Sequence, residues 1–402
     1  MRLKEICDYI SRGTTPDYVN ESPYKVMNQA TFSKGWLDES NLRYTSKNVR
    51  EVQIKKGDLL MASTGGGVLG KVFFFDSDDT SFYADSHVSI LRNSKGKNLM
   101  KYLYYVFSIK YDEINATMVK GSTNQTELQR NYLLAYELDM PPLSKQQLIV
   151  DYLDEKLGNI DARIAVLEKQ QDAYARLKKS IIYHTVTRGL NSNVSLKDSG
   201  VDWIGMIPEH WELRRFKSIF TECKSITQTG EENLLSVSEY YGVARRIDKM
   251  EDGEYESRAN SLIGYKVCKK NDLVINIMLA WKRGLGFSNF DGIVSPAYAV
   301  YRGKNIVPHY FHYLMRTDMY VTEYKRNSKG IIDSRLRMYT DRFNNIMSIF
   351  PPIPEQQTIA DYLDEKCSKI DAAIENIGRQ INALKRLKRA LINEVITGQR
   401  AV

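Results

Sequence analysis

Apolar residues recur at alternating steps of four and three along two stretches of this chain. This spacing places them on one side of a helix through more than about four heptads, which is typical of a coiled-coil seam. We predict that the two helices pack against each other along this stripe. The predicted seam residues are Leu153, Leu157, Ile160, Ile164 and Leu167 in the first helix, and Leu363, Ile370, Ile374, Ile377, Ile381 and Leu384 in the second.

The two stretches are copies of one sequence. The first reads PPLSKQQLIVDYLDEKLGNID from Pro141, and the second reads PPIPEQQTIADYLDEKCSKID from Pro351, an offset of 210 positions (351 − 141). Without a gap, 22 of 47 positions are identical. A period this long indicates the duplication of a whole domain rather than a solenoid. Each copy opens with a proline pair, which suits a helix that begins just after it.

The seam is interrupted in the same place in both copies. Lys178 and Lys388 stand where the next seam residue should fall, so we expect the seam to rotate near the end of each helix. The first helix is predicted from about Lys145 to Val186. About 34 residues at 1.5 Å each would make a rod of roughly 50 Å.

Strand-like runs precede each helix. In the first unit they are YKVMNQ, VQIKKGDLLMAS, GKVFFFDSD and DSHVSILRN, bounded by Gly, Asp and Ser. An apolar, aromatic helix is expected from Leu99 to Tyr111. The second unit repeats KKGDLLMAS as KKNDLVINI and KYLYYVF as HYFHYLM, but STGGGVLG becomes MLAWKRGLG. This pattern predicts one scaffold that presents different loops in its two copies.

The order along the chain is therefore domain, helix, domain, helix. We predict a first domain at 1–140, a helix at 141–190, a linker with a second domain at 191–350, and a second helix at 351–402. The fold class is α+β, with two mixed α/β domains joined by a pair of long coiled-coil helices and an internal repeat. LRRFKSIF in the second unit aligns with MRLKEICDYI at the start of the chain. The first unit thus lacks the segment that precedes this motif in the second. Two alternatives stay open: the N-terminal edge of the first domain is incomplete, or the start of the chain is misassigned.

Composition narrows the class of partner. The 402 residues carry a formal charge of +8 and a pI near 9.0, which favours an anionic partner such as nucleic acid. The four cysteines are scattered without a CxxC pair, so neither a disulfide framework nor a zinc site is expected. The N-terminus is too polar for a signal peptide, and no run approaches 18 apolar residues. We expect a cytoplasmic protein.

Several segments match part of a catalytic or nucleotide-binding motif but lack one of its residues or its structural context. GGGVLGK ends at Lys71 like a phosphate-binding loop, but Val72 replaces the Ser or Thr that holds magnesium, and a strand-like run follows it. SPAY at 295–298 lacks the second proline of the amino-methyltransferase motif. The DEK triplets at 154–156 and 364–366 lie on the long helices and are expected to be surface or interface charges. We predict no catalytic residue, no cofactor site and no metal site in this chain.

Polar and basic loop residues are the candidates for contact with DNA. Arg and Lys hold phosphates or pair with guanine, Asn and Gln pair with adenine, and an aromatic ring can stack or wedge. In the first unit the candidates are Ser11, Arg12, Thr15, Ser63, Thr64, Lys71, Lys120, Ser122, Thr123, Asn124 and Gln125. In the second they are Lys224, Ser225, Trp281, Lys282, Arg283, Lys325, Lys329, Arg335 and Arg337.

The chain resembles the specificity subunits of type I restriction-modification enzymes. The two proline-led repeats given above, the segment KDSGVDWIGMIPEHWELRRFK and the alternation of variable domains with repeated helices are the features that it shares with them. Together they cover nearly the whole chain.

The resemblance implies a non-catalytic chain of a host-defence system. Each variable domain would be a target-recognition domain that reads one half of a bipartite double-stranded DNA sequence. The helices would pack antiparallel, act as a spacer and dock methyltransferase subunits, with two such subunits expected for each chain. S-adenosylmethionine, ATP and magnesium would be bound by the methyltransferase and restriction subunits and not by this chain.

Two alternatives stay open on the sequence. The chain could be a DNA-binding scaffold that no longer works with a methyltransferase, or a single-chain enzyme with a cryptic active site. Binding of a methyltransferase to the outer helix faces separates the first from a specificity subunit. Methylation or cleavage by the purified chain alone would indicate the second.

Overall fold

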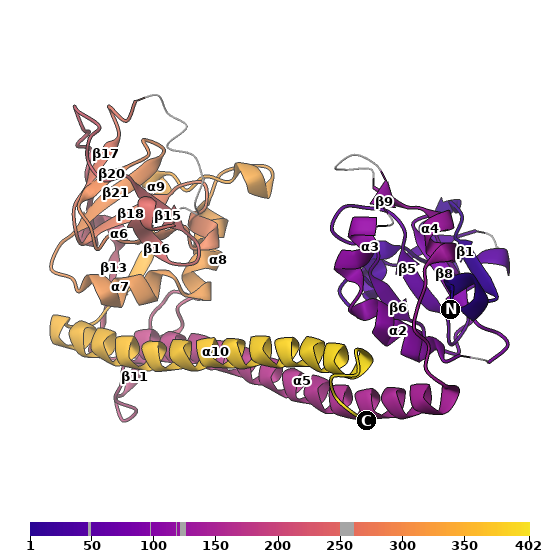
Figure 1. Cartoon of the computed structure of the whole chain (residues 1–402). Helices are drawn as coiled ribbons and strands as arrows, with labels where there is room; N and C mark the ends of the chain where they lie inside the picture. Colours follow the sequence, from indigo (N-terminus) through magenta and orange to yellow (C-terminus); the bar gives the residue numbers. More distant parts are fainter. Residues whose placement is uncertain (47–49, 97, 118, 121–125, 250–260) are drawn as a thin grey trace. The chain divides into compact units, whose positions relative to one another are not determined.

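The fold is a duplicated α+β scaffold. The computed structural model describes residues 1–402 except 47–49, 97, 118, 121–125 and 250–260. The chain forms two compact units, the first made of Met1–Glu168 and Arg379–Val402, and the second of Lys169–Gly378. Both units contain mixed sheets and helices (Figure 1), so the predicted fold class is confirmed.

The first unit contains two four-stranded sheets. Its central antiparallel sheet has the strand order β1-β8-β5-β6, and a second sheet has the order β2-β4-β3-β7. A short hairpin, β9–β10, pairs Lys120 with Glu127. The strands are β1 (Tyr9–Arg12), β2 (Tyr18–Val19), β3 (Tyr24–Met27), β4 (Arg43–Thr45), β5 (Leu59–Ala62), β6 (Val72–Phe74), β7 (Phe82–Ala84), β8 (Val88–Arg92), β9 (Val119–Lys120) and β10 (Glu127–Leu128).

The second unit repeats the central sheet. Its order is β14-β21-β18-β19, and its other pairs are β11–β12, β13–β22, β15–β16 and β17–β20. The strands are β11 (Leu196–Asp198), β12 (Met206–Pro208), β13 (Glu212–Arg215), β14 (Phe220–Glu222), β15 (Leu235–Ser238), β16 (Gly242–Arg245), β17 (Lys266–Cys268), β18 (Asp272–Asn276), β19 (Leu285–Phe287), β20 (Gly292–Val294), β21 (Tyr298–Gly303) and β22 (Met347–Phe350).

The short helices are duplicated in the same order. The first unit has α1 (Leu3–Ile6), α2 (Met100–Ser108), α3 (Tyr111–Thr117) and α4 (Arg130–Ala135). The second has α6 (Phe216–Ile219), α7 (Pro308–Met315), α8 (Asp318–Asn327) and α9 (Thr340–Phe343). Within each unit, the aromatic helix α2 or α7 lies between the central sheet and the long helices (Figure 1). Its packed face explains the aromatic pattern KYLYYVF and HYFHYLM.

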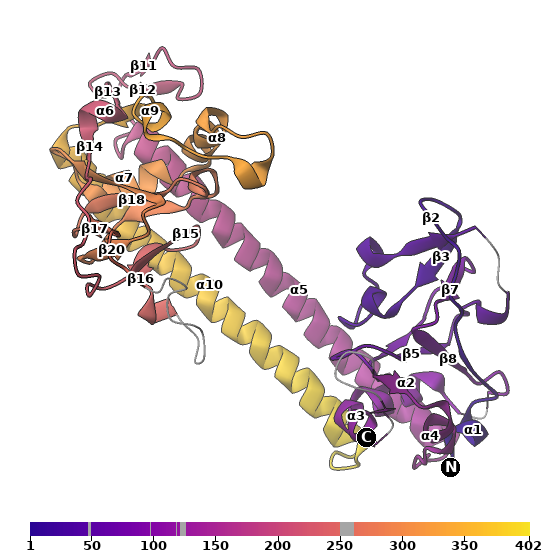
Figure 2. The same cartoon turned by 90° about the horizontal axis from the view of Figure 1, so that it is seen from above.

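The two long helices are α5 (Leu143–Arg188, 46 residues) and α10 (Ile353–Ile396, 44 residues). Each unit contains part of both, because α5 passes from the first unit to the second after Glu168 and α10 passes back after Gly378. The segments of α5 and α10 lie side by side (Figure 2) and run antiparallel within each unit. In the first, Asp161 faces Lys388 and Glu168 faces Lys385; in the second, Gln171 faces Ile374 and Lys178 faces Asp371. The domain limits predicted from the repeat stay a prediction, since the compact units divide the helices midway.

Many seam residues pack into the domains as well as between the helices. Leu153 and Leu157 lie in one core cluster with Leu391, Ile392 and the domain residues around α2. Leu363 lies in the corresponding cluster of the second unit with residues of α7. Ile164, Leu167, Ile370, Ile377 and Ile381 are buried, whereas Ile160, Ile374 and Leu384 are half-buried.

The junction between helix and domain is duplicated in atomic detail. Gln146 accepts a hydrogen bond from the Leu99 amide and donates one to the Pro141 carbonyl. Gln356 makes the same two bonds with Val307 and Pro351. Both amide side chains are buried, so these bonds fix the start of each long helix against the aromatic helix of its domain.

The DEK aspartates serve the same junction. Asp154 accepts a hydrogen bond from Tyr105 at 2.5 Å and pairs with Lys101. Asp364 accepts one from Tyr313 at 2.7 Å, and His309 lies 3.0 Å from it. The triplets thus join helix to domain, as expected of interface charges.

Candidate nucleic-acid interface

In each unit a hairpin is fastened to the end of the strand β5 or β18. The Leu128 amide donates to the Ser63 carbonyl at 2.9 Å in the first unit, and the Met338 amide donates to the Ile277 carbonyl at 2.8 Å in the second. The loop that follows the strand and the hairpin beside it therefore form one surface in each unit. These are the loops whose sequences differ between the copies, and loops on a fixed scaffold are where binding residues are expected.

An aromatic ring with two lysines forms the centre of this surface in the second unit. Trp281 follows β18, and its indole N–H donates to the Met278 carbonyl at 3.0 Å. The ammonium groups of Lys282 and Lys325 lie 5.0 and 5.1 Å from the ring centroid. The structure thus brings together three predicted residues from segments more than forty positions apart. A cationic, partly exposed aromatic site suits contact with phosphates and bases.

The hairpin beside Trp281 is closed by paired backbone bonds. Lys329 and Arg337 each donate an amide hydrogen to the other's carbonyl at 2.9 Å. Lys329 and Arg335 are exposed, while a side-chain N–H of Arg337 donates to the Leu336 carbonyl at 2.9 Å. Lys325 pairs with Asp333 at 3.0 Å. Four predicted basic residues therefore lie on or next to one hairpin.

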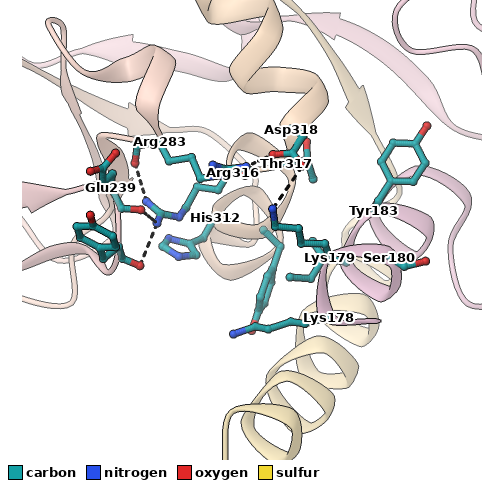
Figure 3. A pocket seen from close by; sticks show the side chains of 13 residues that line it. Lys178, Lys179, Ser180, Tyr183, Glu239, Arg283, His312, Arg316, Thr317 and Asp318 are labelled. Carbon is teal, nitrogen blue, oxygen red and sulfur yellow. Dashed lines mark hydrogen bonds and ion pairs between the residues drawn. The ribbon is translucent and has the colours of Figure 1, made fainter. Parts of the chain in front are cut away.

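Arg283 is directed away from this cluster. Its backbone is left-handed, with φ 62°, and its side chain donates to the Arg316 carbonyl at 3.1 Å and pairs with Asp318 (Figure 3). The structure therefore shows this predicted DNA contact joining the β18–β19 loop to α8. Its guanidinium is engaged within the protein.

In the described part of the structure, every hydrogen bond from the Arg316 side chain goes to a backbone carbonyl. Its guanidinium donates to the carbonyls of Arg283, Leu285, Glu239 and Tyr240 at 2.7–3.3 Å (Figure 3). Burial, together with the nearby charge of Arg283, lowers the pKa of Arg316 to about 10. The residue holds three loops of the second unit together.

A cavity of about 650 Å³ lies beside Arg316, between α5 and α7 of the second unit. Lys178, Lys179 and Arg283 line it. Lys179 and Arg283 both pair with Asp318 (Figure 3), and Lys178 pairs with Asp371 of the facing helix. Each of these three cations is therefore already engaged by a carboxylate of the protein.

Lys224 and Ser225 lie elsewhere on the second unit. Both are exposed in the loop after β14, where the Val267 amide donates to the Ser225 carbonyl at 2.8 Å. β14 is one edge of the central sheet, and β21 lies between it and β18, where the β18–β19 loop begins.

In the first unit the predicted residues gather around the loop 85–87. Arg12 and Thr15 both bond to Ser86, and Thr64 lies 2.6 Å from the imidazole Nδ1 of His87. Arg12 also pairs with Glu127 of the hairpin, and burial lowers its pKa. The surface is polar rather than strongly basic.

Three other predicted residues are engaged within the first unit. Ser63 is buried, and its hydroxyl lies 2.6 Å from that of Ser89. The hydroxyl of Ser11 donates to the Arg12 carbonyl at 3.3 Å, and Lys71 donates to the Ser33 carbonyl at 3.1 Å. Their assignment to DNA stays a prediction.

The remaining predictions fall on β9 and on the chain segment between β9 and β10. Lys120 is in β9, but its side chain is outside the described part of the structure. Ser122, Thr123, Asn124 and Gln125 also lie outside the described residues. These five assignments stay predictions.

Sequence reasoning missed several residues of these surfaces. His87 and Gln29 contact Thr64, and Gln29 is 35 positions away from it. Ile331 and Ile332 form the exposed tip of the second hairpin. The two adjacent isoleucines between Gly330 and Asp333 were a visible signal, whereas nothing in the sequence connects His87 with Thr64.

Among the described residues, no three His, Cys, Asp or Glu side chains gather as metal ligands, and no helix has the length and apolarity to cross a membrane. The glycine-rich loop that ends at Lys71 leads into the strand β6, not into a helix.

Residues 1–173 match the family model of the type I restriction modification DNA specificity domain. The chain is 26% identical over 219 residues to a putative type I restriction enzyme MjaX specificity subunit of Methanocaldococcus jannaschii, covering 52% of this chain and 50% of the relative. It is 22% identical over 369 residues to the MjaVIII specificity subunit of the same organism, covering 87% and 80%. It thus spans half of the first relative's length and four fifths of the second's.

Solved structures show the same fold. One chain comes from a study of complex assembly and conformational transition of the type I R-M system; it aligns over 98% of this chain and 96% of its own, with TM-score 0.68 and 14% identity. The HsdS subunit from Thermoanaerobacter tengcongensis aligns over 100% and 96%, with TM-score 0.52 and 15% identity. The resemblance predicted from the repeats is therefore confirmed: this chain is similar throughout its length to the specificity subunits of type I restriction-modification enzymes.

Proposed function

We propose that this chain is the DNA sequence-recognition subunit of a type I restriction-modification complex. Each unit would read one half of a bipartite double-stranded target. The observation that supports this most directly is the duplicated scaffold, in which the same central sheet and the same fastened hairpin present different side chains. Two copies of one reader with different surfaces are suited to two different half-sites.

The two surfaces differ in chemistry. In the first unit Thr64, His87 and Gln29 form a polar cluster, which can exchange hydrogen bonds with base edges. In the second unit Trp281 and its lysines are suited to phosphates and stacking. We therefore expect the second unit to contribute more of the salt-dependent affinity.

The long helices would serve as a spacer and as a docking surface for methyltransferase subunits. The Asp161–Lys388 pair of the first unit and the Lys178–Asp371 pair of the second are related by the sequence repeat. A repeated surface of this kind suits two copies of one partner. We propose two methyltransferase subunits for each chain, with restriction subunits joining through the complex.

This chain would contribute no catalytic group. In the proposed complex, the partner subunits bind S-adenosylmethionine, ATP and magnesium and perform methylation and cleavage in the cytoplasm, as a host defence. If the chain only recognises DNA, the chain by itself should not methylate DNA.

Methylome sequencing tests the proposal. The chain is expressed with its methyltransferase subunit in a methylation-free host, and matched hosts express either component alone. We expect a bipartite adenine-methylated motif only when both are present. Co-purification of the subunits without any methylated motif would favour the uncoupled scaffold, and methylation by the chain alone would show an enzyme.

A further inference from the structure

Two isoleucines stand at the tip of the second-unit hairpin, between Lys329 and Arg337. Ile331 is 100% exposed and Ile332 is 53% exposed. Single exposed apolar residues are common on protein surfaces. Two adjacent isoleucines at an exposed tip are different, because burying their side chains would be favourable. Their exposure therefore indicates a surface that binds a partner.

The tip is held in a defined shape. The hairpin is closed by the two backbone bonds between Lys329 and Arg337, and Leu336 and Met338 at its base are buried. Gly330 has φ 155°, and a Cβ there would lie 2.6 Å from the Arg335 carbonyl oxygen. A side chain at this position would open the hairpin, so the glycine permits the close turn that presents Ile331.

The charges around the tip favour a polyanion. Lys329 and Arg335 flank the isoleucines and are exposed, and the acidic Asp333 is paired with Lys325. Trp281 and Lys282 lie beside the hairpin's base. An apolar tip inside a basic rim matches DNA, where an aliphatic side chain can enter between base pairs while cations hold the phosphates.

We propose that Ile331, supported by Ile332, is a wedge that inserts from the minor groove into one base step of the half-site read by the second unit. This inference rests on the proposed function. The wedge would partly unstack the step, and Lys329 and Arg335 would contact the flanking phosphates. Flexible pyrimidine–purine steps unstack most easily, so the wedge would select sequence without a hydrogen bond to a base. The segment between β9 and β10 of the first unit, GSTNQ at 121–125, is polar in sequence, so the wedge is assigned to one half-site alone.

Fluorescence of 2-aminopurine tests this directly, since the base brightens when it is unstacked. The full chain, assembled with its methyltransferase subunits, is titrated into duplexes that carry the methylated motif, with the probe moved through each half-site. Target adenines are flipped out of the duplex by methyltransferases, so the probe brightens at those positions as well. Apart from them, we expect one step of one half-site to brighten. Ile331→Ala should abolish that signal and lower affinity by about tenfold or more, because an isoleucine is no longer buried.

Matched variants separate the wedge from other effects. Ile331→Leu should keep most of the signal, and Leu196→Ala, which shortens an exposed aliphatic side chain on β11, should change neither signal nor affinity. Thermal unfolding of each variant confirms that it is folded. If Ile331→Ala fails to bind the methyltransferase but brightens the probe normally, the tip is a protein contact and the wedge is wrong.

Failure of the wedge is distinguishable from failure of the proposed function. A complex that methylates its motif but brightens no step other than the flipped target adenines overturns the wedge and leaves the recognition role intact. A complex that methylates no motif overturns both.

Discussion

The ammonium group of Lys178 lies 2.7 and 2.6 Å from the two carboxylate oxygens of Asp371, across the helix pair of the second unit. The first unit contains the repeat-related pair, in which Lys388 lies 2.7 and 2.6 Å from the oxygens of Asp161. These lysines occupy positions where the apolar seam should continue. The structure shows that each one instead reaches an acid on the facing helix.

This pair should stabilise the antiparallel packing modestly. Asp371→Lys places two cations together and should lower the free energy of unfolding by about 0.5–1 kcal/mol, because a partly exposed pair is weak. Adding Lys178→Asp should restore most of it. Asp172→Lys makes the same charge change at an exposed α5 position and serves as the control in thermal unfolding. If the double variant with Lys178→Asp and Asp371→Lys were as unstable as Asp371→Lys alone, the contact between the two residues would not be attractive.

Helix length should set the gap between half-sites. Inserting about four residues, one helical turn or roughly 5.4 Å, after both Glu168 and Gly378 should lengthen the gap by one or two base pairs at about 3.4 Å each. Both half-sites should keep their sequence, since neither recognition surface changes. Methylome sequencing of the insertion variant measures this, and an unchanged gap would refute the spacer role.

An ion pair with a buried aspartate should stabilise each central sheet. Asp272 is almost fully buried and accepts two hydrogen bonds from Arg302 at 2.9 Å, as Asp58 does from Arg92. Asp272→Asn removes the charge that accepts these bonds and should cost about 2 kcal/mol, because the Arg302 side chain is 53% exposed and water can solvate its guanidinium.

Calorimetry measures that loss. Asp291→Asn is the control, because Asp291 is exposed and accepts a backbone hydrogen bond from Lys270 at 2.7 Å. Equal and small effects of the two substitutions would show that the pair is dispensable.

The second unit should lose stability in mild acid through His312. Burial, then the charges of Arg316 and His309, lowers the pKa of His312 to about 3, while Asp364 opposes the shift. Its ring packs against the backbone of Gly242 and Gly286.

Between pH ~6.5 and ~3 the unfolded imidazole binds a proton and the folded one does not. Stability is therefore highest above pH ~6.5 and should fall by up to about 1.4 kcal/mol for each unit of pH below it. His312→Gln should flatten this slope in pH-dependent thermal unfolding. A variant with the wild-type slope would assign the acid sensitivity to other groups.

Neighbouring basic residues of the β18–β19 loop should respond differently to substitution. Lys282 is exposed beside Trp281, so Lys282→Ala should weaken DNA binding across sequences and reduce the salt slope by about one. Arg283 is engaged by Asp318 and Arg316, so Arg283→Ala should lower stability more than affinity. Salt-dependent binding and thermal unfolding of both variants distinguish the two roles. If Arg283→Ala lowered the affinity for one half-site alone, Arg283 would be a base-contacting residue after all.

Much of the architecture could be predicted from the sequence. The repeat at an offset of 210, the heptad spacing and the proline pairs predict two long helices, because local periodicity dictates which face of a helix is apolar. Likewise, the matching strands KKGDLLMAS and KKNDLVINI predict a shared scaffold, which the structure shows as two central sheets of the same order.

The candidate interface was only partly predictable. Trp281 and Lys282 are adjacent in sequence, but the contribution of Lys325 depends on the packing of α8 against the β18–β19 loop. Arg283 has the right chemistry for DNA, yet a left-handed backbone turns it toward Asp318. Composition identifies which residues could bind, whereas the direction of a side chain depends on contacts with distant segments.

The sequence alone determined the duplication, the helix pair and the kind of residue available in each loop, because these depend on local spacing and on comparison of one copy with the other. Tertiary structure decided which loops share a surface, which charges are already paired, and that Ile331 projects from a closed hairpin. Those features arise from contacts between segments distant along the chain, which no local pattern specifies.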